Sequence, residues 1–341
     1  MDAAPAISVR HVWKIFGPRA ALIRGDLDPN ASKADVLAQT GHVVAVKDAS
    51  FDVRRGEIFV IMGLSGSGKS TLVRCISRLI EPTSGEVWVD GADVCRMDDA
   101  QLRALRRHKM SMVFQHFGLF PHRRIIDNVA YGLEIQGIKR ADRLEKAAQV
   151  LQLVGLKGWE NHYPGNLSGG MQQRVGLARA LAVDPDYLLC DEPFSALDPL
   201  IRREMQDELL NLQKMVQKTI VFITHDFLEA LKIGNHICIM KDGAFVQVGT
   251  PAQIVTQPAD DYVREFVKDV PRARVLTAAA IMRPATAADP ADAPSVRADT
   301  RLDALIPLTA AGLGRLRVVD ENEQTLGWVD RPGLMSALAG A

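Results

Sequence analysis

The chain has 341 residues, of which 47% are hydrophobic and 24% charged, a composition typical of globular rather than disordered proteins. Its 41 Lys and Arg balance 41 Asp and Glu, so the zero net charge argues against a broadly basic, nucleic-acid-binding surface. No apolar run approaches the ~18 residues of a membrane-spanning helix, and the N-terminus lacks the pattern of an export signal. The isolated cysteines, which have no metal-binding spacing, are expected to be buried reduced thiols of a cytosolic protein: Cys75, Cys95, Cys190 and Cys238.

Short apolar, β-rich runs alternate with helical patterns from about residue 5 to residue 270. This alternation predicts an α/β fold with a mostly parallel sheet that helices cover. Residues 18–42 form an early insertion, in which Ser32 to Asp35 is expected to cap a short helix that ends near Gly41. The expected strands are Ile7–Trp13, Val43–Val53, Glu57–Met62, Glu86–Asp90, Met110–Gln115, Tyr187–Cys190, Thr219–Thr224 and His236–Met240.

Between residues 123 and 165 the pattern is helical only, with two apolar stripes around Ile126 to Leu133 and Leu144 to Val154. We therefore expect a helical subdomain, at about residues 117–180, inserted into the α/β domain. A stretch rich in Ala, Pro and Asp at 277–294 indicates a linker or loose edge. The sequence thus predicts a domain at 5–270 and a smaller one at 271–341.

A phosphate-binding loop follows the strand EIFVIM and opens the helical segment STLVRCISRLI. Its glycines allow backbone N–H groups to point at phosphate oxygens, and the helix that begins there adds its positive dipole end. Lys69 supplies a cation for the β- and γ-phosphates, and the Ser70 hydroxyl is a ligand for Mg²⁺. The nucleotide-binding residues are Gly63, Leu64, Ser65, Gly66, Ser67, Gly68, Lys69, Ser70 and Thr71.

Four further polar residues follow three apolar strands, at the edge where nucleotide sites of α/β sheets lie. Asp191 is expected to hold Mg²⁺, and Glu192 to position or polarise the attacking water. His225 follows the strand TIVFIT and is expected to bond the γ-phosphate. Gln115 follows another strand and offers an amide oxygen to the metal or to water.

The segment LSGGMQQR, which begins at Leu167, resembles the signature motif of ABC-type ATPases. The phosphate loop, Gln115, the signature, Asp191-Glu192, the SALD segment and His225 stand in the order found in that family. Ser168 is a good N-cap for the helix that follows, and its start favours an anion. The resemblance implies a homodimer that sandwiches two ATP molecules, each closed by the partner's signature. The signature residues are Leu167, Ser168, Gly169, Gly170 and Gln172, and the interface loop is Ser195, Ala196, Leu197 and Asp198.

The resemblance also implies an aromatic ring stacked on adenine. Phe16 matches that position, and Trp13 is the second choice. An ordinary edge-strand aromatic remains the alternative to either assignment.

Three long segments further resemble the ATP-binding subunits of bacterial quaternary amine importers, of the glycine betaine, proline betaine and choline type: VKDASFDVRRGEIFVIMGLSGSGKSTLVRCISRLIEPTSGEV, MVFQHFGLFPH and DEPFSALDPLIRREMQDELLNLQ. The insertion at 18–42 is shared with this group, whereas most ABC subunits lack it. The resemblance implies ATP and Mg²⁺ as cofactors. It implies a membrane permease and a substrate-binding protein as partners, and no nucleic acid is expected to bind. It places the protein peripherally on the cytoplasmic face of the bacterial inner membrane.

Other readings remain open. An importer of a polar amino acid or another solute would carry the same ATPase motifs, and a non-transport ABC ATPase would share most of them; a P-loop kinase is disfavoured by LSGGMQQR. In the tail, the segments at 281–284, 317–320 and 326–330 resemble one cystathionine β-synthase-type (CBS) motif. Such motifs usually occur in tandem as sensors, so a tail that only stabilises a dimer is an equal alternative.

Overall fold

The computed structural model describes residues 4–23, 33–115, 118–195, 197–286, 289–290, 293–310 and 314–339. It divides into two compact units, Met1–Phe245 and Val246–Ala341. The sequence-based boundary near residue 271 lies inside the second unit, and the independent folding of 5–270 stays a prediction. Among the described residues, none of the helices combines the length and the apolar character needed to traverse a bilayer.

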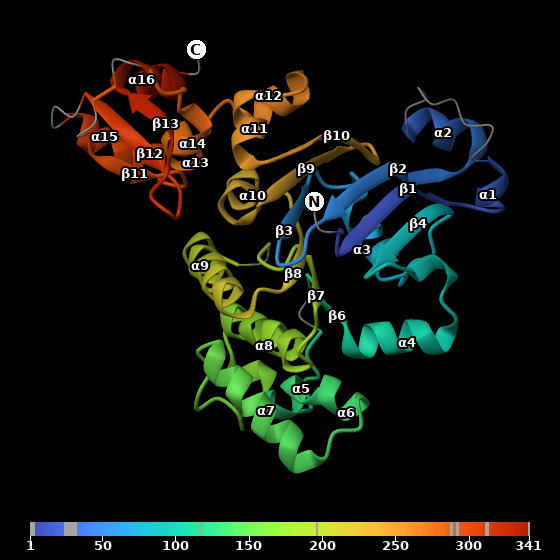
Figure 1. Ribbon diagram of the computed structural model, residues 1–341. Coiled ribbons are helices and arrows are strands. Elements are labelled where there is room, and N and C mark those ends of the chain that lie inside the picture. The colour runs from blue at the N-terminus through green and yellow to red at the C-terminus, as the bar shows by residue number, and fades with distance from the viewer. Residues whose placement is uncertain are drawn as a thin grey trace. The chain divides into compact units, whose positions relative to one another are not determined.

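A parallel sheet forms the centre of the first unit (Figure 1). Its strand order is β9-β3-β8-β7-β6, and β10 (Ala244–Gly249) pairs with the free edge of β9. The side chains of β3, β7 and β8 are buried along their whole length, as expected where helices cover both faces. The parallel strands are β3 Ile58–Met62, β6 Met110–Val113, β7 Tyr187–Asp191, β8 Thr219–Thr224 and β9 His236–Lys241.

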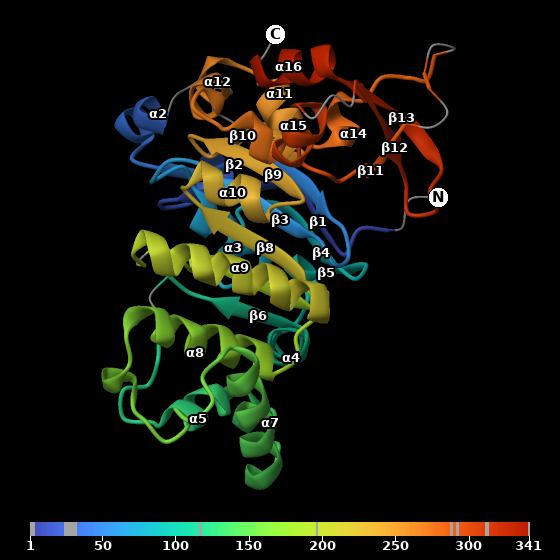
Figure 2. The ribbon, with the colours of Figure 1, turned by 90° about the vertical axis from the view of Figure 1, so that its left-hand side faces the viewer.

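A second sheet, which is antiparallel, corrects the expectation of one mostly parallel sheet. Its order is β2-β1-β4-β5, with β1 at Ile7–Phe16, β2 at Val43–Val53, β4 at Ser84–Val89 and β5 at Ala92–Asp93. Buried and exposed side chains alternate along much of β2, because one face packs on the core while the other faces solvent. Figure 2 shows this sheet beside the parallel one.

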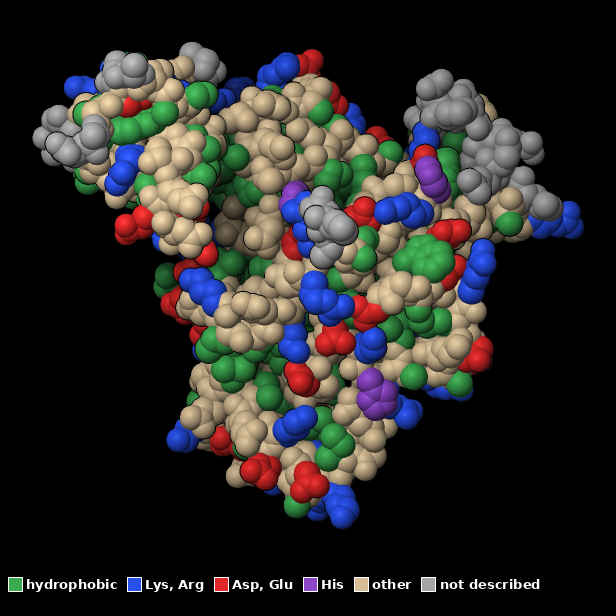
Figure 3. Space-filling model, in the orientation of Figure 1, with side chains coloured by type: hydrophobic (Ala, Val, Ile, Leu, Met, Phe, Trp, Pro, Cys, Tyr) green, Lys and Arg blue, Asp and Glu red, His purple; other side chains and the backbone are tan. Residues whose placement is uncertain are grey.

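Helices form a separate part of the first unit between residues 125 and 182, as the sequence predicts. The apolar stripe expected from Ile126 to Leu133 is divided between two short helices that Ala130 joins. On the face drawn in Figure 3, Lys and Arg are interspersed with Asp and Glu, as expected without net charge. The helices here are α5 Ile125–Val129, α6 Tyr131–Ile135, α7 Arg140–Leu153 and α8 Gly169–Ala182, with a 3₁₀ turn at Pro164–Asn166.

The remaining helices of the first unit surround the two sheets. They are α1 Ala20–Ile23, α2 Lys33–Thr40, α3 Lys69–Ile76, α4 Asp99–His108, α9 Pro199–Val216 and α10 Phe227–Ile233, with a 3₁₀ turn at Val94–Arg96. Helix α2 is the helix expected in the insertion; its proposed cap at Ser32 lies outside the described residues. It ends before Gly41, whose φ of 71° is the left-handed conformation that glycine adopts easily.

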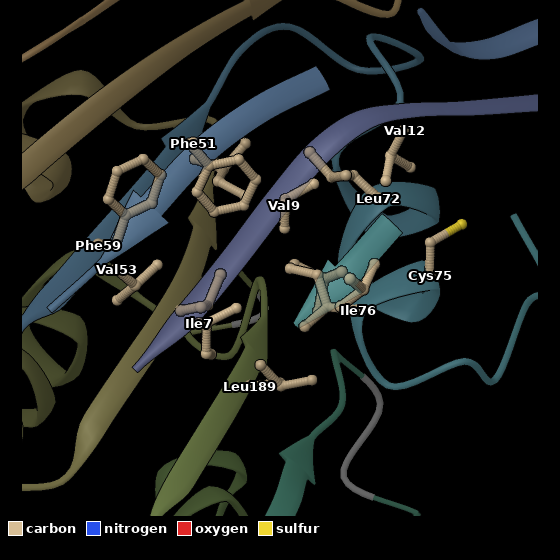
Figure 4. Packing of buried hydrophobic residues seen from close by; sticks show 14 of the residues in the cluster. Ile7, Val9, Val12, Phe51, Val53, Phe59, Leu72, Cys75, Ile76 and Leu189 are labelled. Atoms are coloured by element: carbon tan, nitrogen blue, oxygen red, sulfur yellow. The ribbon is translucent and has the colours of Figure 1, made fainter. Parts of the chain in front are cut away.

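One continuous hydrophobic core joins the two sheets through α3 (Figure 4). Ile7 of β1 and Leu72 of α3 are fully buried there. Phe51 of β2 stacks on Phe59 of β3 with ring centroids 4.8 Å apart. Because α3 is held on both sides, the loop that precedes it has a fixed position. Cys75, Cys190 and Cys238 are buried free thiols and Cys95 is half-buried.

The second unit contains a three-stranded sheet in the order β11-β12-β13, with β11 parallel and β13 antiparallel to β12. Arg283 exchanges two backbone hydrogen bonds of 2.9 Å with Trp328, which joins two of the segments that resemble a CBS motif. The elements are α11 Pro251–Thr256, α12 Asp261–Val267, α13 Arg272–Val275, α14 Ala278–Ile281, β11 Ser295–Arg297, α15 Leu302–Ala310, β12 Arg315–Val319, β13 Thr325–Asp330 and α16 Arg331–Ala339.

Candidate nucleotide-binding site

The phosphate loop connects the carboxyl end of β3 to the first turn of α3. Gly63 and Gly68 have φ values of 157° and 108°, and neither has room for a side chain. A Cβ atom on Gly63 would lie 2.2 Å from the Met240 carbonyl oxygen, and one on Gly68 would lie 2.0 Å from that of Ala45. Glycine at these positions is therefore required by backbone packing as well as by the approach of a phosphate.

Lys69 lies inside this loop, with only 4% of its side chain exposed. Its ammonium donates hydrogen bonds to the carbonyl oxygens of Gly63 (2.8 Å) and Leu64 (3.1 Å) and lies 3.5 Å from a Glu192 carboxylate oxygen. Burial lowers the pKa of Lys69, and the nearby carboxylates oppose this. The Ser67 hydroxyl is buried without a hydrogen-bond partner among the described residues, which leaves a polar atom for a ligand.

Ser70 and Asp191 meet where β7 ends beside α3. The Ser70 hydroxyl donates to Asp191 Oδ1 over 2.7 Å, and the Asp191 side chain is almost fully buried. Arg74 donates to the other oxygen, Oδ2, over 3.1 Å. Hydroxyl and carboxylate oxygens are the donors that Mg²⁺ prefers, so this pair fits the predicted metal site.

Glu192 has an unusual backbone for a residue other than glycine, with φ at 46°. This left-handed conformation is found at active sites where the surroundings hold a strained residue. One carboxylate oxygen of Glu192 faces Lys69, and the other lies 3.1 Å from Nδ1 of His225. The structure therefore brings two other predicted residues, Lys69 and His225, to the carboxylate of Glu192.

Gln115 lies at this edge of the sheet but does not contact the Ser70–Asp191 pair. Its amide nitrogen donates to the Ser195 hydroxyl over 3.3 Å, and Ser195 in turn donates to the Glu192 carbonyl oxygen over 3.0 Å. Gln115 is thus linked to the backbone of the proposed catalytic residue, and its role as a metal ligand stays a prediction. Ala196, next in this loop, lies outside the described residues.

The signature segment begins α8, and Ser168 is its N-cap, as predicted. The Ser168 hydroxyl accepts from the Met171 N–H over 3.4 Å, and Ser168 and Gly169 are exposed. Gly170 is buried, since a Cβ there would lie 2.6 Å from the Ile201 side chain of α9. Ser168 and Gly169 therefore face outward, while the second glycine, Gly170, allows close packing of α8 on α9.

Gln172 stabilises the segment that precedes α8. Its amide nitrogen donates to the carbonyl oxygens of Pro164 (3.1 Å) and Leu167 (3.2 Å), and Leu167 is buried. Asp198 caps α9, where its carboxylate accepts from the N–H groups of Leu200 and Ile201. Gln172 and Asp198 therefore form hydrogen bonds with backbone groups of their own loops, which stabilise the loop conformations.

The two candidates for adenine stacking have different surroundings. Phe16, at the end of β1, is 41% exposed, and the Lys14 ammonium lies 4.9 Å from its ring centroid. Trp13 is partly buried and packs with Ile15 and Val36. An exposed ring suits stacking better, which favours Phe16.

Sequence reasoning missed Arg74 and Gln173. Arg74 stands four residues after Ser70 in α3, so helical spacing alone places it on the same face as the predicted metal ligand. Gln173 is buried in α8 and donates to the Pro193 carbonyl oxygen beside Glu192, a long-range contact that the local sequence does not signal. The described residues contain no group of three His, Cys, Asp or Glu arranged to bind a metal.

Comparisons with known proteins first define the class of protein to which the chain belongs. Residues 46–195 match the family model described as ABC transporter. A solved dimeric bacterial ABC transporter cassette is 32% identical, with a TM-score of 0.61 over 72% of this chain and 98% of that one. Another structure of the same cassette, with a TM-score of 0.60, is a post-hydrolysis state bound to ADP and Pi.

Two curated relatives narrow the class. The glycine betaine/carnitine transport ATP-binding protein of Listeria monocytogenes is 53% identical over 95% of this chain and 80% of its own length. A trimethylamine N-oxide transport system ATP-binding protein of Ruegeria pomeroyi is 50% identical over 99% of this chain and 98% of its own. The chain belongs to this family of ABC transporter ATP-binding subunits, as the sequence motifs predict.

Proposed function

We propose that this protein hydrolyses ATP to drive the import of a small quaternary amine or related trimethylated compound through a separate membrane permease. The observation that carries the proposal is the meeting of Lys69, Asp191 and Glu192 around a glycine-rich nest at the start of α3. Relatives with transport names at 50% identity or more support the coupling to import.

In the proposed mechanism, the loop N–H groups and the start of α3 bind the phosphates of ATP. Lys69 exchanges its two carbonyl partners for phosphate oxygens, which the negative charge of the phosphates favours. Ser70 and Asp191 would hold Mg²⁺, with Gln115 nearby; a bound Mg²⁺ supplies positive charge that neutralises the phosphates. Phe16 offers its exposed ring to adenine.

Glu192 orients the water that attacks the γ-phosphate and accepts its proton. His225, bound to the far oxygen of Glu192, holds that carboxylate and offers its other ring nitrogen to the γ-phosphate. The hydrogen bonds from Gln115 to Ser195 and from Ser195 to the Glu192 carbonyl oxygen link Gln115 to the backbone of the proposed catalytic residue.

A second copy of the chain completes each site in this proposal. Ser168 and Gly169 lie at the exposed start of α8, and the γ-phosphate held by a partner is a suitable anion for this helix end. Leu64 in the phosphate loop and Leu200 beside Asp198 are 56% and 65% exposed. Large apolar side chains at these two loops support a protein interface there. The dimeric cassette that this chain resembles agrees with it.

A groove in the first unit offers a seat for the permease. It has a volume of about 290 Å³ and lies between the end of α3, α4 and β6 on one side and α6 and α8 on the other. Leu79, Phe114 and Ile135 line it and are each more than a third exposed, while Arg106, Arg107 and Arg179 add positive charge. Such a mixed lining suits an amphipathic helix of a cytoplasmic loop. The proposal therefore includes a peripheral position on the cytoplasmic face of the membrane, where this groove would receive the permease.

The tail is proposed to be a single CBS-type module. Asp289 accepts hydrogen bonds from Arg283 over 2.6 Å and from Arg315 over 3.4 Å, and Arg283 also bonds Asp330 over 3.2 Å. The contact between Arg283 and Asp330 joins two of the three segments whose sequences carry the resemblance. Arg283 lowers the pKa of Asp289 well below its usual range, so the cluster stays charged at neutral pH.

The cargo is argued from relatives, since the ATPase subunit does not contact it. Glycine betaine, carnitine and proline betaine appear in the names of relatives that are 53% identical or more, whereas the methionine importers that match are 43% identical. Trimethylamine N-oxide is the second candidate, because the relative from Ruegeria pomeroyi matches along nearly the whole of both chains. Choline remains the further prediction made from the sequence.

The test is reconstitution of the chain with its permease and substrate-binding protein in liposomes. We expect ATP hydrolysis to rise when one trimethylated compound from a panel is added, and not when amino acids are added. A control complex with Glu192→Gln should show no rise. Stimulation by a polar amino acid alone would overturn the cargo, and failure to bind any permease would favour a non-transport ATPase.

A further inference from the structure

The outer side of the phosphate loop is held by residues that the mechanism above does not use. The backbone N–H of Gly243, in the turn after β9, donates to the Ser67 carbonyl oxygen over 2.9 Å. The ammonium of Lys33, the first residue of α2, donates to the Gly66 carbonyl oxygen over 3.1 Å. Two successive carbonyl oxygens of the loop therefore accept hydrogen bonds from groups outside the phosphate cavity.

The Lys33 contact connects to the catalytic lysine through one peptide group. The peptide whose oxygen Lys33 holds carries the N–H of Ser67, which donates to the Leu64 carbonyl oxygen over 3.2 Å. That same oxygen accepts from Lys69 over 3.1 Å. Because a trans peptide is planar, holding its oxygen also sets the direction of its N–H. Lys33 thus helps to set the positions of Leu64 and Lys69.

Hydrophobic packing holds helix α2 in place, which keeps Lys33 beside the phosphate loop. Val36 is 5% exposed and packs with Ile15 and Val44, the ends of the two strands that flank the insertion. Lys33 is half-buried, and its aliphatic stem lies beside Gly243, where an added Cβ would be 3.3 Å from Cε. Burial lowers the pKa of Lys33, and Asp242 opposes this. Partial burial of an ammonium costs free energy, which Lys33 would avoid in an exposed rotamer. Such burial is unusual for a lysine on a surface helix.

We propose that Lys33 is a positioning residue of the ATP site, and that helix α2 in the insertion at 18–42 is part of that site. Lys33 holds the peptide between Gly66 and Ser67 so that the loop is shaped for phosphate before ATP arrives. The inference rests on the proposed ATP site and adds to it an element outside the strand, loop and helix of the phosphate-binding motif.

The first test compares Lys33→Ala with Lys33→Arg in the full chain, with ATP affinity measured calorimetrically in the Glu192→Gln background to prevent turnover. We expect Lys33→Ala to raise the Kd for ATP by about 5- to 10-fold, because one charge-assisted hydrogen bond is lost. Lys33→Arg, which keeps the donor and the charge, should restore most of the affinity. Gln39→Ala, an exposed change in the same helix, should leave the Kd unchanged.

The second measurement is amide hydrogen exchange of residues 63–69 without nucleotide. Lys33→Ala should accelerate exchange there while the thermal unfolding midpoint stays near that of Gln39→Ala, which separates positioning from a general loss of stability. Wild-type Kd and wild-type exchange in Lys33→Ala would overturn the inference. Lys69→Ala is measured in parallel: if its Kd is also unchanged, the ATP site itself is wrongly placed.

Discussion

At the scale of single residues, the site is built around one carboxylate in an uncommon conformation. Glu192 keeps φ at 46° although a glycine would adopt that backbone at less cost. Lys69 on one side and His225 on the other hold its two oxygens. The proposed role of Glu192 as a base toward water gives a reason for a glutamate, rather than a glycine, in this strained conformation.

Replacing Glu192 with Gln removes the base while keeping the shape and the bond to His225. We expect kcat for ATP hydrolysis to fall by about 10²- to 10⁴-fold, the usual contribution of a general base. ATP affinity should be kept, because the phosphate contacts do not change. Phosphate release and equilibrium nucleotide binding measure the two quantities. Glu204→Gln, on the exposed face of α9, is the control, and hydrolysis at the wild-type rate in Glu192→Gln would remove Glu192 from the mechanism.

At the scale of elements, helices α9 and α10 meet at a buried polar pair. Glu229 of α10 is 5% exposed, and its carboxylate accepts a hydrogen bond from Gln206 of α9 over 2.9 Å. Burial raises the pKa of Glu229 above its ordinary value of 4.5, and Asp226 contributes in the same direction. The contact is thus specific but costs free energy while the carboxylate is ionised.

The sign of the pH dependence follows from this raised pKa. Between the ordinary pKa and the raised one, the folded state binds a proton that the unfolded state has released, so Glu229 lowers stability as pH rises. Glu229→Gln keeps an acceptor for Gln206 without the charge. We expect it to be more stable than wild type at pH 8, with the difference shrinking as pH falls toward 4.5. Urea unfolding across pH measures this, and a difference that grows on acidification would contradict it.

At the scale of the whole molecule, the proposed function needs a second copy of the chain to cover an exposed surface. Ser168 and Gly169 are exposed at a helix start, and Leu64 and Leu200 are exposed beside the phosphate loop and the α9 cap. Exposed apolar side chains are unfavourable in water, and the proposed second copy across the nucleotide would bury them.

The change Ser168→Arg places a long cation at the proposed contact. In the Glu192→Gln background, which keeps ATP bound, we expect wild-type-like protein to dimerise with ATP and the Ser168→Arg variant to remain monomeric. Light scattering measures mass. Nucleotide binding by the monomer should stay within about 2-fold, since the proposed contact of Ser168 is with the ATP of the partner. An ATP-dependent dimer of normal affinity in the variant would contradict the shared site.

The predicted domain boundary has its own test. Removing residues 271–341 should leave basal ATP hydrolysis within about 2-fold, because the described residues of the nucleotide site all precede residue 246. The measurement is phosphate release by the purified truncated chain. Complete loss of hydrolysis, with a folded circular dichroism spectrum, would show that the tail is needed for catalysis.

Local sequence signals predicted much of this protein. The strands at 43–53 and 219–224 have the expected bounds, and the phosphate loop lies between a buried strand and a helix as its motif requires. Glycine spacing, apolar runs and N-caps are properties of neighbouring residues, so the sequence alone specified these features and the ABC family.

Tertiary structure decided the features that depend on distant residues. The separate antiparallel sheet, the Arg74 contact with Asp191 and the Lys33 contact with Gly66 each join segments far apart in the chain. No local propensity encodes which strand edge or side chain a segment will meet. The sequence thus determines which chemical groups the site contains. The packing of the two sheets and the insertion determines which residues those groups contact.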